Sequence, residues 1–238
     1  MPHRDDSRYR ALAKPLLLGN HEATITADID QLAEHISLTV PVRDIVPVGA
    51  AQTFRHRSSY RIAGDMGLTA ACATPTRLWV DESSDCAVVL LNQGHARYAL
   101  DGHAFLASAG ATGMFLPGME YLQETSLASG LIYNLSPQLL ARYLGEASGG
   151  TLHLDDALHL LRQPQAINLE HPAMQQVLFG LQVLIRTIDT MGPVQQPDSR
   201  PLVQLQEGIY ALTAALLKPD DAPRALNSWQ PMPMGSLN

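Results

Sequence analysis

Residues 93–118 read QGHARYALDGHAFLASAGATGMFLPG and decide how the middle of the chain folds. Apolar and polar side chains alternate on both sides of Asp101-Gly102, a residue pair that strongly favours a two-residue hairpin turn. The pattern predicts a β-hairpin in which Leu100 pairs with His103. The glycine-punctuated return that follows predicts a third strand beside the hairpin.

The two histidines of this hairpin, His95 and His103, raise the question of a metal site. Because side chains alternate along a strand, the predicted register places His103 on one face with Tyr98 and Phe105, and His95 on the other face. Metal-binding jelly rolls also use two histidines two residues apart with a carboxylate soon after, and none of the nine histidines has this spacing. The stretch therefore predicts a barrel wall and no metal site.

Short segments of this kind continue from about residue 40 to 135, separated by glycine, proline, asparagine and aspartate. Many short strands at even spacing are typical of an antiparallel sandwich or barrel. The hydrophobic period is helical on both sides of this region. Residues 28–37 form an amphipathic stripe after the N-cap Asp28, and helical patterns return from residue 136 onward. The sequence therefore predicts an α+β fold, an antiparallel barrel or jelly roll followed by an α-helical C-terminal region.

The composition is that of a globular protein, with 238 residues, 46% of them hydrophobic, and a formal net charge of −7. An acidic chain offers no electrostatic footprint for a phosphate backbone, so direct nucleic-acid binding by this part is not expected. We find no run of about 18 apolar residues and no secretory signal, and we expect a cytoplasmic protein without membrane contact. Cys72 and Cys86 are expected to be buried free thiols rather than a disulfide.

Candidate ligand-binding residues lie in the predicted strands. The segment FRHRSSYRI, residues 54–62, places His56 and Tyr60 on one face, which suits a pocket wall or a plain core. Its arginines alternate on the other face, which is expected to be solvated, although such a row can also hold an anion. Trp79 is expected inside the barrel, where it fills the core or stacks on a ligand. The full candidate set is His56, Tyr60, Trp79, Tyr98, His103 and Phe105.

Motifs of catalysis were sought and not found: the sequence has no nucleophile elbow, phosphate loop, dinucleotide fingerprint or metalloprotease pair. We therefore expect no enzymatic activity and no cofactor.

The order of these elements resembles the N-terminal ligand-sensing half of AraC/XylS-type transcriptional regulators, in the branch whose sensor is a metal-free, cupin-like barrel. The likeness spans roughly residues 15–217. It rests on DIDQLAEHIS at 28–37, on VGAAQTFRHRSSYRIAGDMGLTAACATPTRLWV at 48–80, on the hairpin with its LPG return at 116–118, and on IYNLSPQLLARYLGE at 132–146.

The resemblance implies an effector-sensing and dimerisation module. It divides the chain into an N-terminal arm and short helix (1–39), a cupin-like barrel (40–136), a helical dimerisation region (137–217) and a linker or tail (218–238). In the family, a separate domain with two helix-turn-helix motifs binds DNA, and the 21 residues after Leu217 are too few for it. We therefore expect either a regulatory fragment or an orphan sensor that reaches DNA only through another domain.

A homodimer is expected through the helical region, where one apolar stripe could pack against a second copy or against the preceding helix. The stripe consists of Leu202, Leu205, Ile209, Leu212 and Leu216. Two other functions stay open at this point: a cupin-like small-molecule enzyme, and a purely structural oligomerisation module with a filled barrel. The identity of the effector is not encoded in any motif.

Overall fold

A computed structural model describes residues 12, 14–50, 53–191 and 199–218. The turn at Asp101-Gly102 forms as predicted, with φ angles of 48° and 73°, the positive values that a type I′ turn requires. Leu100 pairs with His103, and the register continues without a slip back to His95. The face assignment of the hairpin is therefore confirmed.

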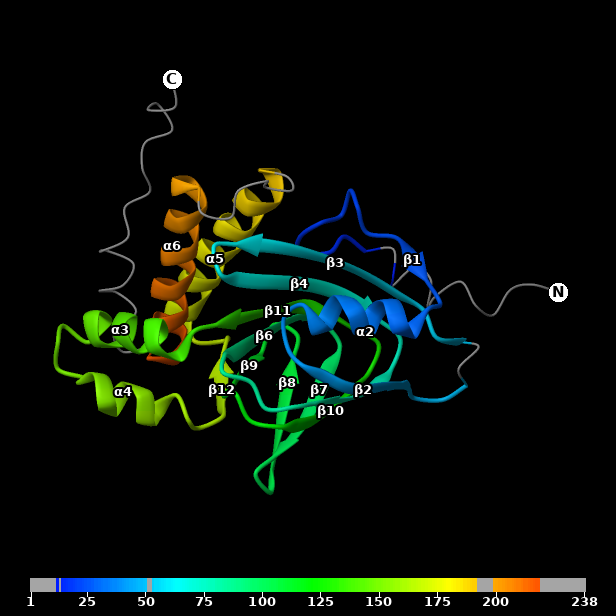
Figure 1. The fold of residues 1–238 in the computed structure, drawn as a ribbon, viewed down its shortest axis with the longest axis horizontal. Helices are drawn as coiled ribbons and strands as arrows, with labels where there is room; N and C mark the ends of the chain where they lie inside the picture. The colour runs from blue at the N-terminus through cyan, green and yellow to red at the C-terminus, as the bar shows by residue number, and fades with distance from the viewer. Residues whose placement is uncertain (1–11, 13, 51–52, 192–198, 219–238) are drawn as a thin grey trace.

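Antiparallel strands form one curled sheet in the described part of the chain, in the order β1-β3-β4-β11-β6-β9-β8-β7-β10-β5-β2, with β12 paired to β9 (Figure 1). Strands β3 to β11 correspond to short segments that the sequence predicts as strands within residues 40–135. The strands are β1 (Ile25–Thr26), β2 (Val42–Pro47), β3 (His56–Ala63), β4 (Met66–Ala73), β5 (Thr76–Val80), β6 (Cys86–Gln93), β7 (His95–Leu100), β8 (His103–Ser108), β9 (Thr112–Leu116), β10 (Tyr121–Thr125), β11 (Ala128–Leu135) and β12 (Gln165–Asn168).

Helices occur on both sides of the strand region, as predicted. They are α2 (Ile29–Ser37), α3 (Pro137–Ala147), α4 (Leu154–Leu160), α5 (Pro172–Thr190) and α6 (Arg200–Leu217). Asp28 caps α2 by accepting hydrogen bonds from two backbone N–H groups of its first turn. Ser136 caps α3, with Pro137 at the first helical position. The short elements α4 and β12 carry no strong periodic signal and were not predicted.

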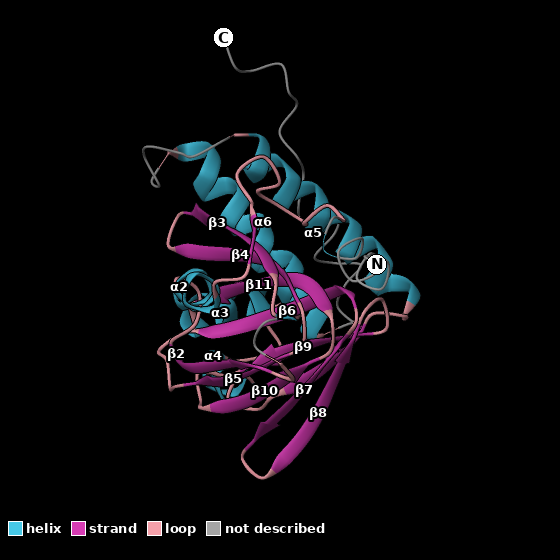
Figure 2. Ribbon diagram, turned by 90° about the vertical axis from the view of Figure 1, so that its right-hand side faces the viewer, coloured by secondary structure: helices cyan, strands magenta, loops and turns pink. Residues whose placement is uncertain are grey.

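The sheet has a different partner on each of its faces, and this produces two cores. Helices α5 and α6 cover the outer face of β3, β4, β11 and β6 (Figure 2). Alternate side chains of the same strands point into the curl of the sheet, where they meet β5, β7 and β10 and form a second cluster. Helix α2 lies across the open side of the curl, against β2 and β3 (Figure 1). The predicted α+β fold, a barrel-like antiparallel sheet followed by helices, is confirmed.

The arginine row of β3 is not solvated, and that expectation is wrong. Residues 16–22 run over the outer face of β3 and cover it. Ser59 donates to the carbonyl of Leu18 at 2.7 Å, and Arg57 donates to the carbonyl of Asn20 at 3.0 Å. Arg61 is 9% exposed. The N-terminal segment, which has too few residues for a periodic signal, is thus a structural cover for the barrel.

Arg61 connects this cover to the helical layer. Its guanidinium donates to Glu22 at 2.7 Å and lies 3.6 Å from Asp189 near the end of α5. The same Asp189 carboxylate accepts the backbone N–H of Gly19 at 2.6 Å. Just beyond Arg61, Gln206 of α6 donates to Asp65 in the β3–β4 turn. The barrel and the helices are therefore joined by polar contacts as well as by the shared core.

Two further observations complete the fold. Cys72 and Cys86 are buried free thiols, as predicted. Within the described ranges, no helix is both long enough and apolar enough to span a membrane. Residues 1–11 and 13 of the predicted arm, and residues 219–238 of the predicted tail, lie outside the described residues.

Candidate ligand-binding cavity

A cavity of about 90 Å³ lies inside the curl of the sheet, beneath α2. Leu32 and Ile36 of α2 form its roof, and apolar side chains of β4, β6 and β11 form one wall. Helical periodicity explains the roof, because residues four apart lie on the same side of a helix. The lining residues are Leu32, Ile36, Ile45, Thr69, Ala71, Ala73, Thr76, Leu78, Val89, Leu91, Gln123, Thr125 and 128–132. This volume is well below the roughly 300–1,000 Å³ of pockets for drug-sized ligands, so the cavity suits only a molecule of a few non-hydrogen atoms.

The polar groups of the cavity come mainly from the opposite wall, β5 and β10. Thr76 and Thr125 face each other across these strands, with their hydroxyl oxygens 3.0 Å apart, and they satisfy each other. Gln123, two residues before Thr125, lies on the same inner face. Its carboxamide makes no hydrogen bond to any other part of the chain that the structure describes. Gln123 is therefore the polar group of the lining that is available to a ligand.

The roof is anchored by hydrogen bonds at the C-terminal end of α2. Nδ1 of His35 and Oγ of Ser58 on β3 lie 2.7 Å apart. Thr69 of β4 donates to the carbonyl of His35 at 3.2 Å, and its hydroxyl also contacts that of Thr39. Because the links end on β3 and on β4, a shift of α2 would break them. The roof is thus held by a few polar contacts together with the packing of its apolar face.

His56 and Tyr60 lie on the inner face of β3, one strand away from the cavity. His56 pairs with Ala73 and Tyr60 pairs with Thr69, and both of these partners line the cavity. His56 is buried against Phe54, with ring centroids 5.7 Å apart. Burial, with a contribution from His35, lowers the pKa of His56 to about 4, so the imidazole is neutral at physiological pH. Both residues extend the wall beneath α2 without touching the cavity.

Tyr98 lies in the interior of the barrel, opposite Gln123 on the adjacent strand. It is fully buried, and its ring lies 5.9 Å from that of Tyr121. Neither phenolic hydroxyl has a hydrogen-bond partner among the described residues. Burial raises the pKa of both hydroxyls, so both stay protonated.

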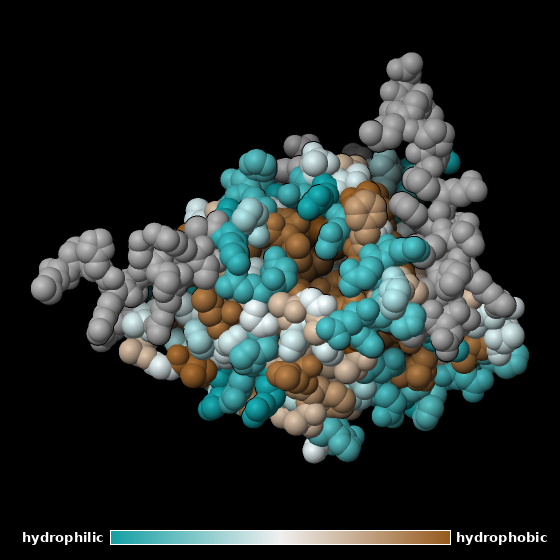
Figure 3. Space-filling model, turned by 180° about the vertical axis from the view of Figure 1, so that it is seen from behind, coloured by the Kyte–Doolittle hydropathy of each residue, from teal (hydrophilic) through white to brown (hydrophobic). Residues whose placement is uncertain are grey.

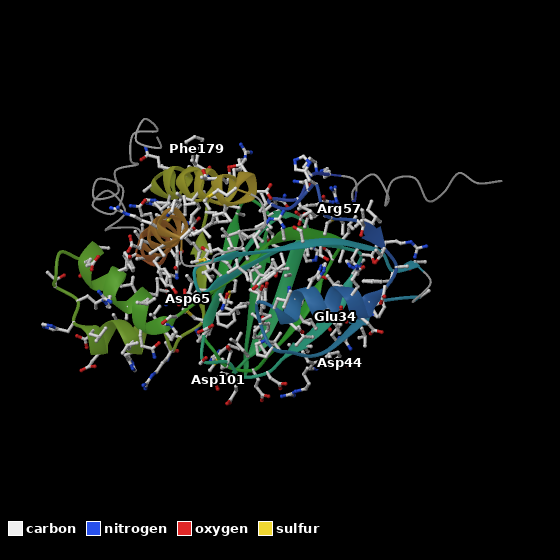
Figure 4. The ribbon with its side chains drawn as sticks, turned by 45° about the horizontal axis from the view of Figure 1, so that its top comes forward. Glu34, Asp44, Arg57, Asp65, Asp101 and Phe179 are labelled. Atoms are coloured by element: carbon white, nitrogen blue, oxygen red, sulfur yellow. The ribbon has the colours of Figure 1, made fainter. Side chains whose placement is uncertain are left out.

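The other three predicted site residues lie away from the cavity. Trp79 was expected inside the barrel, but it points to the outer face of β5, where Arg77 covers its ring at 5.9 Å. The buried residues of β5 are its neighbours on either side, so the inward parity belongs to Leu78. His103 and Phe105 share a face as predicted, with ring centroids 6.5 Å apart. They lie on the projecting end of the hairpin, which Asp101 marks in Figure 4, and His103 is exposed.

The predicted dimer stripe on α6 is packed inside the single chain. Leu202, Ile209 and Leu212 are 0% exposed, Leu216 is 2% exposed, and Leu205 is half-buried. Helices α3 and α5 and the outer face of the sheet cover them. Sequence periodicity shows that a helix has a buried face but not which surface buries it. The intramolecular alternative accounts for this stripe, so a dimer requires another surface.

Metal ligands do not gather in the described part of the chain: no group of three or more histidine, cysteine, aspartate or glutamate side chains is close enough to hold an ion. His95 and His103 are both exposed and on opposite faces of the hairpin.

The arrangement can be compared with known proteins. The solved structure of the AraC-like transcriptional activator CuxR matches 82% of this chain and 70% of its own, with a TM-score of 0.57 and 13% sequence identity. The two proteins share a fold. The resemblance inferred from the sequence is therefore confirmed at the level of the fold.

Lower scores accompany matches over smaller shares of the chain. The EutQ protein of Clostridium difficile matches 36% of this chain and 65% of its own, with a TM-score of 0.30 and 13% identity. A cupin-like protein of Thermotoga maritima matches 37% of this chain and 75% of its own, with a TM-score of 0.30 and 10% identity. No protein-family model matches the sequence, and no curated protein matches it.

Sequence reasoning missed Gln123 and the roof residues Leu32 and Ile36. The signal for Gln123 was present in YLQET, residues 121–125, because strand parity places the first, third and fifth residues on one face. The roof could not be found in this way. The amphipathic pattern of 28–37 gives the buried face of the helix, but not the cavity that this face closes.

Proposed function

We propose that this chain is the effector-sensing module of a transcriptional regulator of the AraC type. The observation that carries the proposal is the cavity, which is lined mainly by apolar side chains, contains one unpartnered carboxamide, and is covered on one side by α2. The fold shared with an AraC-like activator supports it. A ligand that contacts both the sheet and α2 would favour one position of the roof.

Signal transmission would use the contacts between the barrel and the helical layer. Strands β4, β6 and β11 line the cavity on one face and contact the helical core on the other. A side chain displaced by a ligand therefore shifts neighbours in a tightly packed layer. The ion pairs of Arg61 add a direct connection between β3 and α5. The helices are the elements through which a change in the cavity would reach a partner domain.

The experiment is a thermal-shift screen of small metabolites. A molecule that binds only the folded state raises the unfolding temperature by mass action. The decisive variant is Ala71→Leu, which places a larger side chain in the cavity. The matched control is Ala99→Leu on the exposed face of β7. Hits should lose their effect in Ala71→Leu and keep it in Ala99→Leu. A screen without hits, or hits that are insensitive to Ala71→Leu, would contradict the proposal.

We propose further that the chain forms a homodimer through the outer side of α5. Phe179 is 69% exposed and Val183 is 41% exposed, and their spacing of four places them on one face of the helix. Phe179 lies on the side of α5 that faces away from the sheet (Figure 4). Patches of apolar surface between polar side chains are visible on the back of the molecule (Figure 3), and exposed apolar patches commonly mark interfaces.

Light scattering tests the dimer with two variants. Phe179→Glu removes the exposed ring and adds a charge, and we expect it to shift the wild-type dimer to monomer. Gln163→Glu adds the same charge at an exposed position outside α5 and should leave the dimer intact. A wild-type chain that stays monomeric at high concentration would contradict the dimer, and a Phe179→Glu dimer would contradict this interface.

A further inference from the structure

Two buried hydroxyls inside the barrel, those of Tyr98 and Tyr121, have no hydrogen-bond partner in the described residues, and the half-buried carboxamide of Gln123 beside them makes no hydrogen bond to the described residues either. They lie next to one another on the inner face of two adjacent strands. Gln123 of β10 pairs directly with Tyr98 of β7, and Tyr121 precedes Gln123 by two residues on the same face. Directly paired side chains in a sheet have Cβ atoms about 5 Å apart. The three groups therefore form one polar corner in an otherwise apolar interior.

This concentration is unusual for a folded interior. The side chains of Tyr98 and Tyr121 are 0% and 6% exposed, and the large majority of buried polar atoms in proteins have at least one hydrogen-bond partner. Tyr133 illustrates the normal case in this chain. Its hydroxyl is also buried, but it lies on the outer face of the sheet and pairs with the hydroxyl of Thr213 at 3.1 Å. The polar corner thus lacks partners that a bound molecule can supply.

The surroundings define the chemistry of that molecule. None of the described residues that line the cavity is charged, and an unpaired ion in an apolar site loses its hydration without compensation. An ionised ligand is therefore disfavoured. The two tyrosines remain protonated, because burial raises the pKa of their hydroxyls, so they act as hydrogen-bond donors. A carboxamide has an acceptor oxygen and a donor nitrogen, which allows Gln123 to link these hydroxyls to a ligand.

We propose that Tyr98, Tyr121 and Gln123 form the polar end of the ligand site, and that the ligand is a small neutral molecule with an apolar body and a hydrogen-bond-accepting carbonyl group. Gln123 lines the cavity and contacts the ligand, with its nitrogen donating to the carbonyl oxygen. The tyrosines are positioning residues: their hydroxyls, unpartnered among the described residues, donate to the oxygen of the carboxamide once the ligand is bound and so hold it in this orientation. This inference rests on the proposed function, since it describes the same cavity.

The test uses two probes of nearly equal shape, cyclopentanone and cyclopentane, which differ in the carbonyl group. Their affinities for the folded chain are measured by ligand-observed NMR. A net hydrogen bond is expected to give the wild type a preference of about two- to tenfold for the ketone. Gln123→Leu should abolish this preference and retain the binding of cyclopentane. Tyr98→Phe should weaken ketone binding alone.

Tyr133→Phe is the matched control, because it removes a buried hydroxyl on the other side of the sheet. It should lower the stability of the fold and leave the ketone preference unchanged. Equal binding of both probes by the wild type, or a preference for the ketone that persists in Gln123→Leu, would contradict the proposed role of Tyr98, Tyr121 and Gln123. Neither result would contradict ligand binding in the cavity. Failure of both probes to bind would overturn the proposed function and this inference together.

Discussion

Truncating Ile209 to alanine tests the location of the α6 stripe more sharply than any other single change. Ile209 is 0% exposed and belongs to the core shared by the sheet and the helices. Removing a buried side chain of this size costs about 2–5 kcal/mol, through lost transfer free energy and the cavity left behind. Because α6 is covered by α3 and α5 within the chain, we expect the full cost in the monomer. For a chain of this length the unfolding temperature falls by about 2–4 °C per kcal/mol.

The assay is urea unfolding followed by circular dichroism at two protein concentrations tenfold apart, below the range in which light scattering detects dimers. The Ile209→Ala variant should show a lower midpoint by the same amount at both concentrations, with an unchanged slope. Phe179→Ala, at an exposed position, should change the free energy of unfolding by less than about 0.5 kcal/mol. A cost below about 1 kcal/mol for Ile209→Ala, or a cost that appears only as the concentration rises, would refute the intramolecular packing of this stripe.

Three other outcomes are expected. Arg61→Met should lower the free energy of unfolding by about 1.5–3 kcal/mol, because it removes charge-assisted hydrogen bonds from a buried site. The control Arg77→Met breaks an exposed ion pair and should lower it by less than about 1 kcal/mol. Equal losses of stability in the two variants would contradict the structural role of the N-terminal cover. Because the pKa of His56 is about 4 in the fold and about 6.5 in the unfolded chain, the unfolded state binds more protons between these values. Stability should therefore fall as the pH drops from 6.5 to 4, and His56→Gln should flatten this part of a denaturation series. Dialysis against a chelator should leave the unfolding temperature unchanged, and a stoichiometric metal in elemental analysis would contradict the expected metal-free barrel.

The hairpin and the capped helices were predictable because their signals are local. A two-residue turn at Asp101-Gly102 fixes the register, and the register fixes which side of the hairpin faces inward. Asp28 and Ser136 identify the starts of two helices by capping chemistry alone. Such features depend on a few neighbouring residues and need no knowledge of the rest of the fold.

The candidate site was harder to predict because it depends on which surfaces meet. Trp79 was expected inside on the basis of its size, although strand parity gives the inner position to Leu78. The apolar residues of α6 have the same sequence pattern whether they pack in a dimer or in a core. Likewise, the arginines of β3 look solvated until the segment around Leu18 is seen to cover them. Only the tertiary structure assigns a partner to each face.

The most direct test of the account is a crystal structure of the chain bound to a hit from the thermal-shift screen. The account predicts density for the molecule between Ile36 of α2 and Gln123 of β10, inside the curl of the sheet. It also predicts that the carboxamide of Gln123 lies within hydrogen-bond distance of the ligand. Density on the outer surface, with the cavity closed and unchanged, would contradict the claim that this barrel is a sensor.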